Sequence, residues 1–348
     1  MAPTTVCFAS PRGGSGKSTV AAQLSAAFAA HNELRNVLLI DCSLHADSTV
    51  YLLGGVREPD ELVHGIRTQG QLVMHKNPTK TAADFFTQAY NAKSGSTLGR
   101  AWRSIKSPML EDFMIKSSVA SNLFVLPGGP KLYEAVTSVN RADVSKAVYE
   151  KIQNLGDDWM VVFDLDAELM ERPASLLGLE VSNSIVVVLS PQWADFQRVV
   201  DDPINSLFTA LKHLRNTTGQ HGTVSAFLFN KCEKTRNAES LPFPFTGVNS
   251  AVEACAQICG YAQNQIFSRE TGFSQFFNVT TTNAERFAVQ YVTALHNLPE
   301  NIIQKSNMTG VQIPYLTTGS GVTQDALDTT KTILDCVRAK LEDGFTKK

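Results

Sequence analysis

The clearest chemical signal in the sequence is a glycine-rich stretch over residues 12–19, which reads RGGSGKST. Phosphate oxygens are bound by several backbone N–H groups at close approach, and glycine allows the backbone to come that close. Lys17 supplies a mobile cation for the outer phosphates, and Ser18 supplies a hydroxyl ligand for Mg²⁺. An apolar run at residues 6–10 precedes the stretch, and an Ala-rich segment with apolar residues at helical spacing follows it at 19–30. This order predicts a nucleotide phosphate site that is formed by Gly13, Gly14, Ser15, Gly16, Lys17, Ser18 and Thr19.

Five more short apolar runs each end in a loop of small, polar or acidic residues. They cover residues 37–40, 123–126, 160–163, 185–189 and 224–229. Several are apolar throughout, as strands buried on both faces are, and helix-like segments lie between them. This alternation predicts a doubly wound α/β fold with a mostly parallel sheet. Because the carboxyl ends of parallel strands share one edge of a sheet, we expect the six loops to form a single site.

Composition limits the remaining function classes. The chain has 348 residues, a formal net charge of −2 and 43% hydrophobic residues, which is typical of a folded globular protein. The near-neutral charge argues against a surface built as a whole for nucleic acid, and the most hydrophobic run is too short to span a bilayer. Six scattered cysteines without a metal-binding spacing, and the lack of a basic segment before Arg12, predict reduced thiols and a cytoplasmic location.

The phosphate loop and the strand ends together resemble the deviant Walker A ATPases related to ParA and MinD. The family loop has a signature lysine at the position of Arg12, whereas the general Walker A pattern has glycine at the position of Pro11. The stretches over 36–41, 122–129, 159–164 and 229–231 resemble the family's second strand, third strand, Walker B strand and adenine-reading asparagine. The resemblance covers residues 3–60 and 120–300.

This resemblance implies a P-loop NTPase fold that binds ATP or ADP together with Mg²⁺. It implies that Asp41 and Asp164 order the Mg²⁺ shell with Ser18, and that Asn230 reads the adenine. It also implies a homodimer that forms on ATP binding, in which Arg12 keeps the charge of the signature lysine and reaches the partner's nucleotide. The protein would then be an ATP-controlled switch that positions or segregates a cargo.

Two departures from the family pattern concern hydrolysis. Ser43 stands where the family has the aspartate that positions the attacking water, and a serine cannot polarise water as a carboxylate does. The residues after Asp164 also lack the family's D-x-P-P sequence, so Asp166 or His45 is a candidate for positioning the water instead. We therefore expect Mg²⁺-dependent ATP hydrolysis to be slow. The alternative is a catalytically impaired, nucleotide-bound scaffold, and a small-molecule kinase would need an acceptor pocket that no residue set identifies.

The sequence predicts a P-loop domain over residues 1–300, followed by a linker and a helical tail over 301–348. Residues 67–106 form a basic insertion with seven basic residues and one acidic residue. The aromatic residues interleaved with them are Phe85, Phe86, Tyr90 and Trp102. Such a segment fits nonspecific nucleic acid, an acidic protein partner, or a solvated insertion without a specific role.

The tail is expected to contain a loop and a helix. Residues 305–324 are rich in Gly, Ser and Thr, which predicts a loop or linker, and a helix over 325–343 is expected to stop at Gly344. Ile333, Leu334, Val337 and Leu341 form an apolar stripe, which predicts core packing or contact with a partner helix. Acidic residues are mixed with the basic ones in this helix, and this argues against membrane binding.

Overall fold

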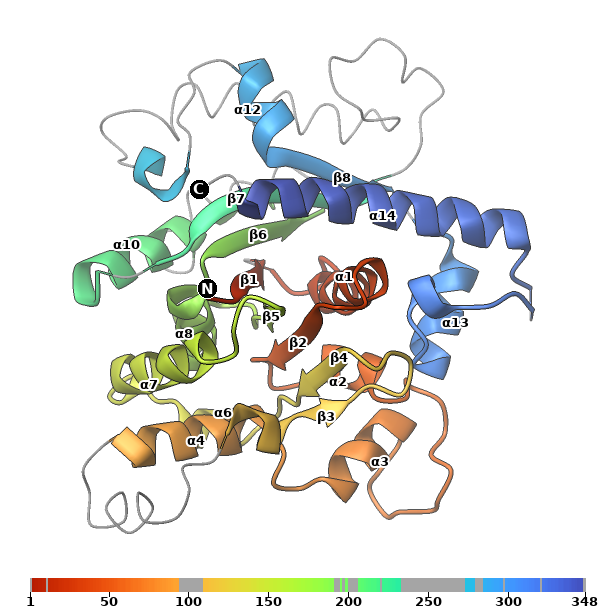
Figure 1. The fold of residues 1–348 in the computed structure, drawn as a ribbon, viewed down its shortest axis with the longest axis horizontal. Coiled ribbons are helices and arrows are strands. Elements are labelled where there is room, and N and C mark those ends of the chain that lie inside the picture. Colours follow the sequence, from red (N-terminus) through yellow and green to blue (C-terminus); the bar gives the residue numbers. More distant parts are fainter. Residues whose placement is uncertain are drawn as a thin grey trace.

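An eight-stranded sheet lies at the centre of the computed structural model. The structure describes residues 2–10, 12–93, 109–190, 195, 198–199, 206–219, 221–232, 273–278, 284–296, 298–319 and 321–346. The strand order is β3-β4-β2-β5-β1-β6-β7-β8 (Figure 1), and neighbours are parallel except for β3 and β4. The strands are β1 (Thr4–Ala9), β2 (Asn36–Asp41), β3 (Ile115–Lys116), β4 (Leu123–Leu126), β5 (Trp159–Asp164), β6 (Ser184–Leu189), β7 (Thr223–Cys232) and β8 (Val292–His296). The predicted doubly wound, mostly parallel α/β fold is confirmed.

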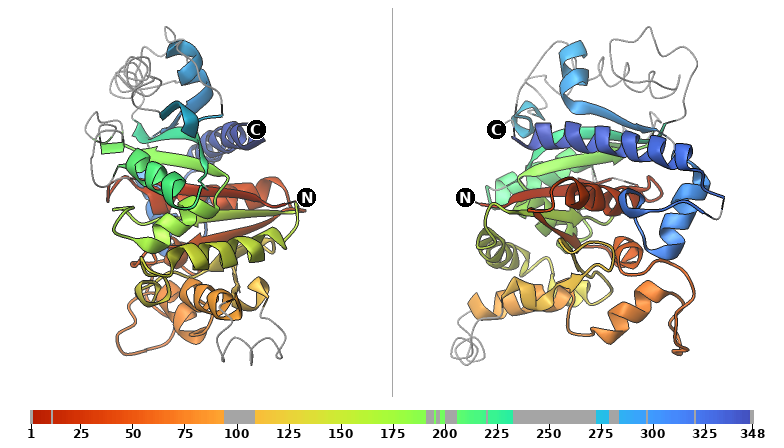
Figure 2. Two further views of the ribbon diagram at one scale, coloured as in Figure 1. Left: turned by 90° about the vertical axis from the view of Figure 1, so that its left-hand side faces the viewer. Right: turned by 45° about the vertical axis from the view of Figure 1, so that its right-hand side comes forward.

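Helices cover both faces of this sheet (Figures 1 and 2). One apolar core cluster lies under α4 (Ala82–Lys93), α6 (Leu132–Ala135), α7 (Arg141–Gln153), α8 (Pro173–Val181), α10 (Leu207–Thr217) and α12 (Ala284–Tyr291). The other lies under α1 (Lys17–His31), α2 (Asp47–Leu52), α13 (Glu300–Thr309) and α14 (Gln324–Thr346), with α3 (Gln69–Lys76) at its margin. In β1, Cys7 and Ala9 enter the first cluster whereas Val6 and Phe8 enter the second, as expected for a strand that is buried on both faces.

The six strands predicted from apolar runs are all present, with small shifts of their ends. The sequence did not indicate β3 or β8. β3 has only two residues and pairs antiparallel with β4 at the edge of the sheet. β8 follows α12 directly, without the turn residues that usually announce a strand. The missed strands therefore lack the local signals on which the prediction depended.

The C-terminal segment differs from the prediction of a loop and a short helix. Residues 305–309 belong to α13, and Ile313–Tyr315 form a 3₁₀ helix, so a linker over the whole of 305–324 was wrong. α14 continues through Gly344 to Thr346, because the last turn packs Phe345 against Phe28 of α1 with ring centroids 6.2 Å apart. This tertiary contact outweighs the helix-breaking tendency of glycine.

The apolar stripe of α14 is part of the core. Leu334, Val337 and Leu341 are buried in the same cluster as α1, and Ile333 packs against that cluster. The interpretation as core packing is confirmed, so this stripe does not offer a surface for a partner helix.

Aromatic residues of the basic insertion are also buried. Phe85 and Phe86 of α4 lie in the core, where Phe85 packs on Phe113 with ring centroids 5.7 Å apart. These two rings therefore cannot stack on nucleic acid bases, which corrects one basis of that interpretation. Residues 94–108, with Trp102, lie outside the described residues. In the parts of the chain that are described, no helix is both long and apolar enough to cross a membrane.

Candidate nucleotide site

The glycine-rich loop between β1 and α1 borders a cavity of about 370 Å³. Gly14 and Gly16 have φ angles of +84° and +78°, a backbone conformation that favours glycine. A Cβ atom added to Gly13 or Gly14 would meet no heavy atom within 4 Å, so a ligand can approach the backbone closely there. No side chain caps the N-terminus of α1, which leaves its first N–H groups for a ligand. All the predicted phosphate-binding residues, 13–19, line this cavity.

The same cavity is bordered by the loops after β2 and β5. These loops contribute Ser43, His45, Asp47, Asp166 and Ala167, and Tyr51 of α2 joins them. Burial and the nearby Asp47 carboxylate raise the pKa of Tyr51, so its phenol stays protonated and can donate a hydrogen bond. His45 and Asp166 face the space in front of the phosphate loop, where a water-positioning group would have to lie.

Lys17 is held by an acidic side chain. The register of β2 and β5 places Asp41 opposite Asp164 at the ends of neighbouring strands. Lys17 Nζ lies 2.5 Å from Asp164 Oδ1 and 3.5 Å from Ser18 Oγ. Both partners of this ion pair are buried, with side-chain exposures of 9% for Lys17 and 0% for Asp164. The cation that the sequence assigns to phosphates is thus neutralised by the protein itself.

The side-chain oxygen atoms next to Lys17 are suitable ligands for a divalent cation. Asp164 Oδ2 is buried and has no hydrogen-bond partner among the described residues, and the Ser18 hydroxyl lies beside Lys17. Mg²⁺ typically uses one or two protein oxygens together with phosphates and water. The described residues contain no cluster of three or more His, Cys, Asp or Glu side chains that could form an all-protein metal site. The arrangement suits an ion that arrives with a nucleotide.

Asp41 organises the loop that follows β2. Its Oδ1 accepts hydrogen bonds from the backbone N–H and the hydroxyl of Ser43, at 2.9 and 2.7 Å. Its Oδ2 accepts from Ser48 Oγ at 2.9 Å and from the N–H and hydroxyl of Thr49 at 3.1 and 2.7 Å. Burial, followed by the charge of Asp164, raises the pKa of Asp41. Both oxygens are engaged, so Asp41 shapes the site through residues 43–49.

Ser43 is engaged in the same network. Its hydroxyl donates to Asp41 and accepts a hydrogen bond from the N–H of Ala46 at 3.1 Å. Ala46 has a φ angle of +55°, which is unusual for a residue with a Cβ atom and is stabilised by this contact. The Ser43 hydroxyl is therefore used for loop structure.

Arg12 forms an ion pair within its own chain. Its Nη1 lies 2.9 Å from Oδ1 of Asp195, which is 2% exposed and also accepts a hydrogen bond from Ser190 Oγ. The Arg12 side chain remains 47% exposed. In the single chain, the residue predicted to reach a partner is thus directed to the segment after β6.

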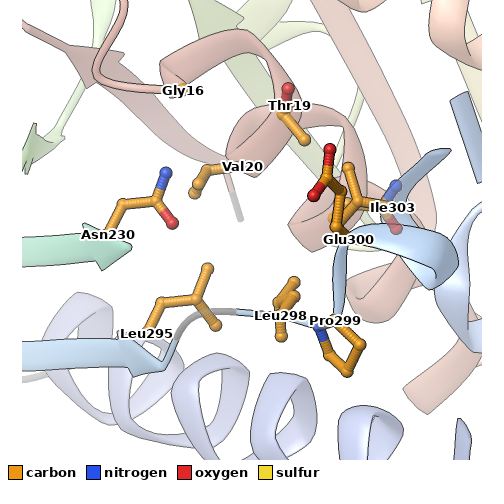
Figure 3. Close-up of a pocket in the computed structure, with 10 residues that line it drawn as sticks. Gly16, Thr19, Val20, Asn230, Leu295, Leu298, Pro299, Glu300 and Ile303 are labelled. Carbon is orange, nitrogen blue, oxygen red and sulfur yellow. The ribbon is translucent and has the colours of Figure 1, made fainter. Parts of the chain in front are cut away.

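A second cavity of about 370 Å³ adjoins the first at Gly16 and Thr19 (Figure 3). Asn230, at the end region of β7, borders it and donates a hydrogen bond from Nδ2 to the carbonyl of Ser15 at 2.8 Å. The other lining residues are Val20, Gln23, Leu295, Leu298, Pro299, Glu300 and Ile303. Sequence reasoning missed residues 295–303, because neither β8 nor α13 carries a recognisable motif.

The six predicted loops do meet at one edge of the sheet. The loop after β4 joins the others through Gly128, whose N–H donates to Thr49 Oγ1 at 3.2 Å. Asp195 brings in the segment that follows β6, and Asn230 brings in the end of β7 itself. The expected convergence is confirmed, and it was predicted from the alternation of strand-like and helix-like segments in the sequence.

Comparison with known proteins agrees with this geometry. The family model of the CobQ/CobB/MinD/ParA nucleotide binding domain matches residues 6–258. No curated protein matches the chain in sequence. Among solved structures, the ATP complex of a McdA variant from Cyanothece is 11% identical with a TM-score of 0.56, and the match covers 98% of this chain and 96% of that chain.

A second solved structure extends the comparison. The pNOB8 ParA protein bound to nonspecific DNA is 11% identical with a TM-score of 0.51, and 98% of each chain is covered. At these identities the likeness concerns the fold, whereas the family model identifies the nucleotide-binding domain over most of the chain. The chain belongs to the CobQ/CobB/MinD/ParA family of nucleotide-binding domains.

Proposed function

We propose that the protein is an ATP-binding switch of the ParA/MinD type. In this proposal, ATP with Mg²⁺ brings two copies together as a homodimer that positions or segregates a cargo in the cytoplasm. The single observation that carries the proposal is the pair of adjoining cavities, one at the phosphate loop and one at Asn230, which share Gly16 and Thr19. Together they have the layout that a nucleoside triphosphate requires.

Each part of the site has a role in this proposal. The backbone of residues 13–16 and the N-terminus of α1 bind the phosphates, and Lys17 neutralises their charge. Ser18 and Asp164 hold Mg²⁺, which when bound supplies further positive charge to the phosphates. Asp41 keeps the loop over residues 43–49 in place beside them. Asn230 borders the cavity that would hold the adenine.

Slow hydrolysis is part of the proposal. The Ser43 hydroxyl is engaged with Asp41 and Ala46 and is not free to orient a water molecule. His45 and Asp166 border the phosphate cavity and are the candidates for that task. Precise positioning of the attacking water accounts for much of phosphoryl-transfer catalysis, so the loss of the family's aspartate favours a long-lived ATP state.

Partners are proposed as follows. Arg12 would exchange Asp195 for the nucleotide of the second copy when the homodimer forms. Residues 67–106 would bind a protein partner or, through their excess of basic residues, nonspecific nucleic acid. Within the described part of this insertion, Lys76 is paired with Glu61 at 2.8 Å, so its positive charge is already balanced. Most of the positive charge available to a partner would then come from the basic residues over 93–106.

Light scattering coupled to size-exclusion chromatography tests the switch. We expect the wild-type protein to change from monomer to dimer with ATP and Mg²⁺, and to remain monomeric with ADP. Lys17→Ala serves as the control that cannot engage the phosphates. A monomer under all conditions, in a preparation that binds ATP by calorimetry, would contradict the dimerising switch.

A scaffold without turnover is the second candidate, and the engagement of the Ser43 hydroxyl favours it. Steady-state phosphate release distinguishes the two. The switch requires release above the level of Lys17→Ala, whereas a scaffold gives the same background in both proteins.

A further inference from the structure

The loop after β5 contains an arginine that the proposed function does not use. Arg172 lies directly before α8, and its side chain is 29% exposed. Its guanidinium carbon lies 5.1 Å from the centroid of the Tyr133 ring of α6, and its Nη2 lies 3.1 Å from Glu168 Oε2. An aromatic face and a carboxylate both attract a guanidinium, and together they define its position. Arg172 is therefore held in place from two sides.

The Nε–H group of Arg172 has no hydrogen-bond partner among the described residues, although its nitrogen is buried. A buried donor without a partner is uncommon in a folded protein and requires an explanation. The Nε atom lies 3.9 Å from Oδ2 of Asp166. An N–H···O hydrogen bond needs about 3 Å, so a movement of about 1 Å would complete one between these two atoms.

Asp166 is itself held at the edge of the phosphate cavity. Its N–H donates to Oγ of Ser175, which is completely buried in α8, and its Oδ1 accepts from the N–H of Ala167, both at 2.8 Å. Oδ2 takes part in neither contact. A carboxylate oxygen has two lone pairs, so Oδ2 can accept from Arg172 and from a water molecule in the cavity at the same time.

The backbone between Asp166 and Arg172 has an unfavourable conformation at Glu168. Its φ angle is +59°, which is unusual for a residue with a Cβ atom. Leu165 and Leu169 are completely buried on either side of this turn, and the ion pair with Arg172 holds the Glu168 side chain. Such conformations persist where the surrounding structure imposes them, and they are common at catalytic sites. The turn brings Arg172 back to Asp166.

His45, the other candidate for positioning the attacking water, lacks this support. Its side chain is exposed, and in the described part of the chain no hydrogen bond or ion pair holds it. Ordering a free side chain costs conformational entropy, whereas much of this cost is already met for Asp166. The structure therefore favours Asp166.

We propose that Arg172 is a positioning residue that holds the Asp166 carboxylate against the attacking water, an inference that rests on the proposed ATP binding. In the ATP complex, Arg172 Nε donates to Asp166 Oδ2, and the water donates to the same carboxylate. The water oxygen forms a bond to the γ-phosphorus, the bond from that phosphorus to the β,γ-bridging oxygen breaks with its electron pair on the leaving ADP, and the water proton ends on the released phosphate. Arg172 acts on this step only through Asp166.

Single-turnover hydrolysis of ATP with Mg²⁺ and excess protein tests the proposal, with calorimetry for the ATP affinity. We expect Arg172→Ala to hydrolyse bound ATP about tenfold more slowly than the wild type, because the carboxylate is no longer held in place. Its dissociation constant for ATP should stay within about twofold of the wild type, since Arg172 is not among the residues that line the phosphate cavity. Arg172→Lys keeps the charge without the forked guanidinium and should be about threefold slower, and it replaces the alanine variant if that protein does not fold.

Two further variants show whether Arg172 acts through Asp166. The double variant Asp166→Asn/Arg172→Ala should be no slower than Asp166→Asn alone, because residues that act as a unit do not give additive losses. Arg57→Ala is the matched control, since Arg57 also pairs with an aspartate, Asp60, at 3.8 Å but lies outside the cavity. Its rate should equal that of the wild type.

A hydrolysis rate that Arg172→Ala and Arg172→Lys leave unchanged would overturn the proposal. A further loss in the double variant would also overturn it, because Arg172 would then act independently of Asp166. If the wild type binds ATP but hydrolyses it no faster than Lys17→Ala, this proposal fails and ATP binding stands. If the wild type does not bind ATP, the proposed function itself fails.

Discussion

At the scale of single residues, the ion pair between Lys17 and Asp164 would, in the proposed function, couple the binding of ATP to the binding of Mg²⁺. ATP would have to draw Lys17 away from a buried carboxylate, and an unpaired buried carboxylate is costly unless a cation replaces the lysine. We therefore predict that Asp164→Asn binds ATP about tenfold more tightly than the wild type in EDTA, because the competing charge is gone. Added Mg²⁺ should strengthen ATP binding to the wild type much more than to the variant. Calorimetry with and without Mg²⁺ measures both effects.

Asp166→Asn is the control for this prediction. Asp166 borders the phosphate cavity but does not touch Lys17, so the variant should keep the wild-type response to Mg²⁺. An Asp164→Asn protein that binds ATP in EDTA no better than the wild type would show that the ion pair does not restrain Lys17.

Ser43 gives a second prediction at this scale, which concerns stability. Ser43→Ala removes one hydrogen bond to Asp41 and one from the N–H of Ala46. We expect the free energy of unfolding to fall by about 1–3 kcal/mol at pH 7. Urea unfolding measures this, with Ser118→Ala at an exposed position as the control. An unchanged stability at pH 7 would mean that the loop after β2 does not depend on this hydroxyl.

The effect should also depend on pH, because the pKa of Asp41 is raised in the folded protein. A raised carboxyl pKa means that the folded state holds the proton more tightly, so the contribution of Asp41 to stability is full below its unfolded pKa and declines as the pH rises through the folded value. The Ser43 hydroxyl favours the charged form and limits that decline. Ser43→Ala should therefore destabilise the protein less near pH 4 than at pH 7.

Most residues that line the phosphate-loop cavity were predictable from the sequence, whereas their roles stay predictions. The spacing of the glycines, Lys17 and Ser18 indicates a phosphate-binding loop, and Asp41 and Asp164 each end an apolar run. The partner of each side chain was not predictable. The pairing of Arg12 with Asp195, 183 residues later in the chain, depends on how distant segments pack, and so does the position of Glu300.

At the scale of elements, α13 connects the two cavities. Its N-terminal residues line the second cavity, beside Asn230. Its last turn is held to the chain after α2 by hydrogen bonds from the N–H groups of Val56 and Arg57 to the carbonyls of residues 307 and 308, at 2.8 and 3.1 Å. Gln312, just beyond α13, donates to the carbonyl of Tyr51 at 2.6 Å, and Tyr51 lines the phosphate cavity. A displacement of α13 would therefore change the lining of both cavities.

Gln23 tests this role of α13. Gln23→Leu removes the hydrogen bonds to Ser306 and Ile313, and we predict that it weakens ATP binding about tenfold but affects inorganic triphosphate much less, because triphosphate has no base. Gln23→Glu should restore ATP binding, since a carboxylate can accept from both partners. Competition against a fluorescent ATP analogue gives the two affinities. Equal losses for ATP and triphosphate would indicate a general loss of structure instead.

The elements themselves were predicted unevenly, for physical reasons. Six strands were found because their residues are buried, several of them on both faces, which makes their sequences predominantly apolar. α13 was not predicted because its sequence over 300–309 is mostly polar. α14 does not end at Gly344 because Phe345 packs into the core. Local patterns identify elements whose burial is uniform, and tertiary packing decides the rest.

At the scale of the whole molecule, α14 belongs to the core that holds the P-loop helix. Its apolar side chains are buried in one cluster with α1 and β1, and these side chains are Leu327, Leu334, Val337, Leu341 and Phe345. Burial of five such side chains contributes about 10 kcal/mol, which is comparable to the whole stability of a domain. The segment after residue 300, expected to be a linker and a tail, thus takes part in the stability of the nucleotide site.

We accordingly predict that removal of residues 321–348 abolishes both folding and ATP binding. A point substitution tests the same idea in the full chain. Leu334→Asp puts a charge into the core and should unfold the protein, because an unpaired buried carboxylate costs several kcal/mol, whereas Ala339→Asp on the exposed side of the same helix should melt like the wild type. Thermal melting by circular dichroism, together with calorimetry for ATP, measures both. If the chain without α14 still folds and binds ATP, residues 1–300 form the domain by themselves and the helix is an appendage. In that case the packing of Phe345 on Phe28 is a consequence of the fold and does not stabilise it.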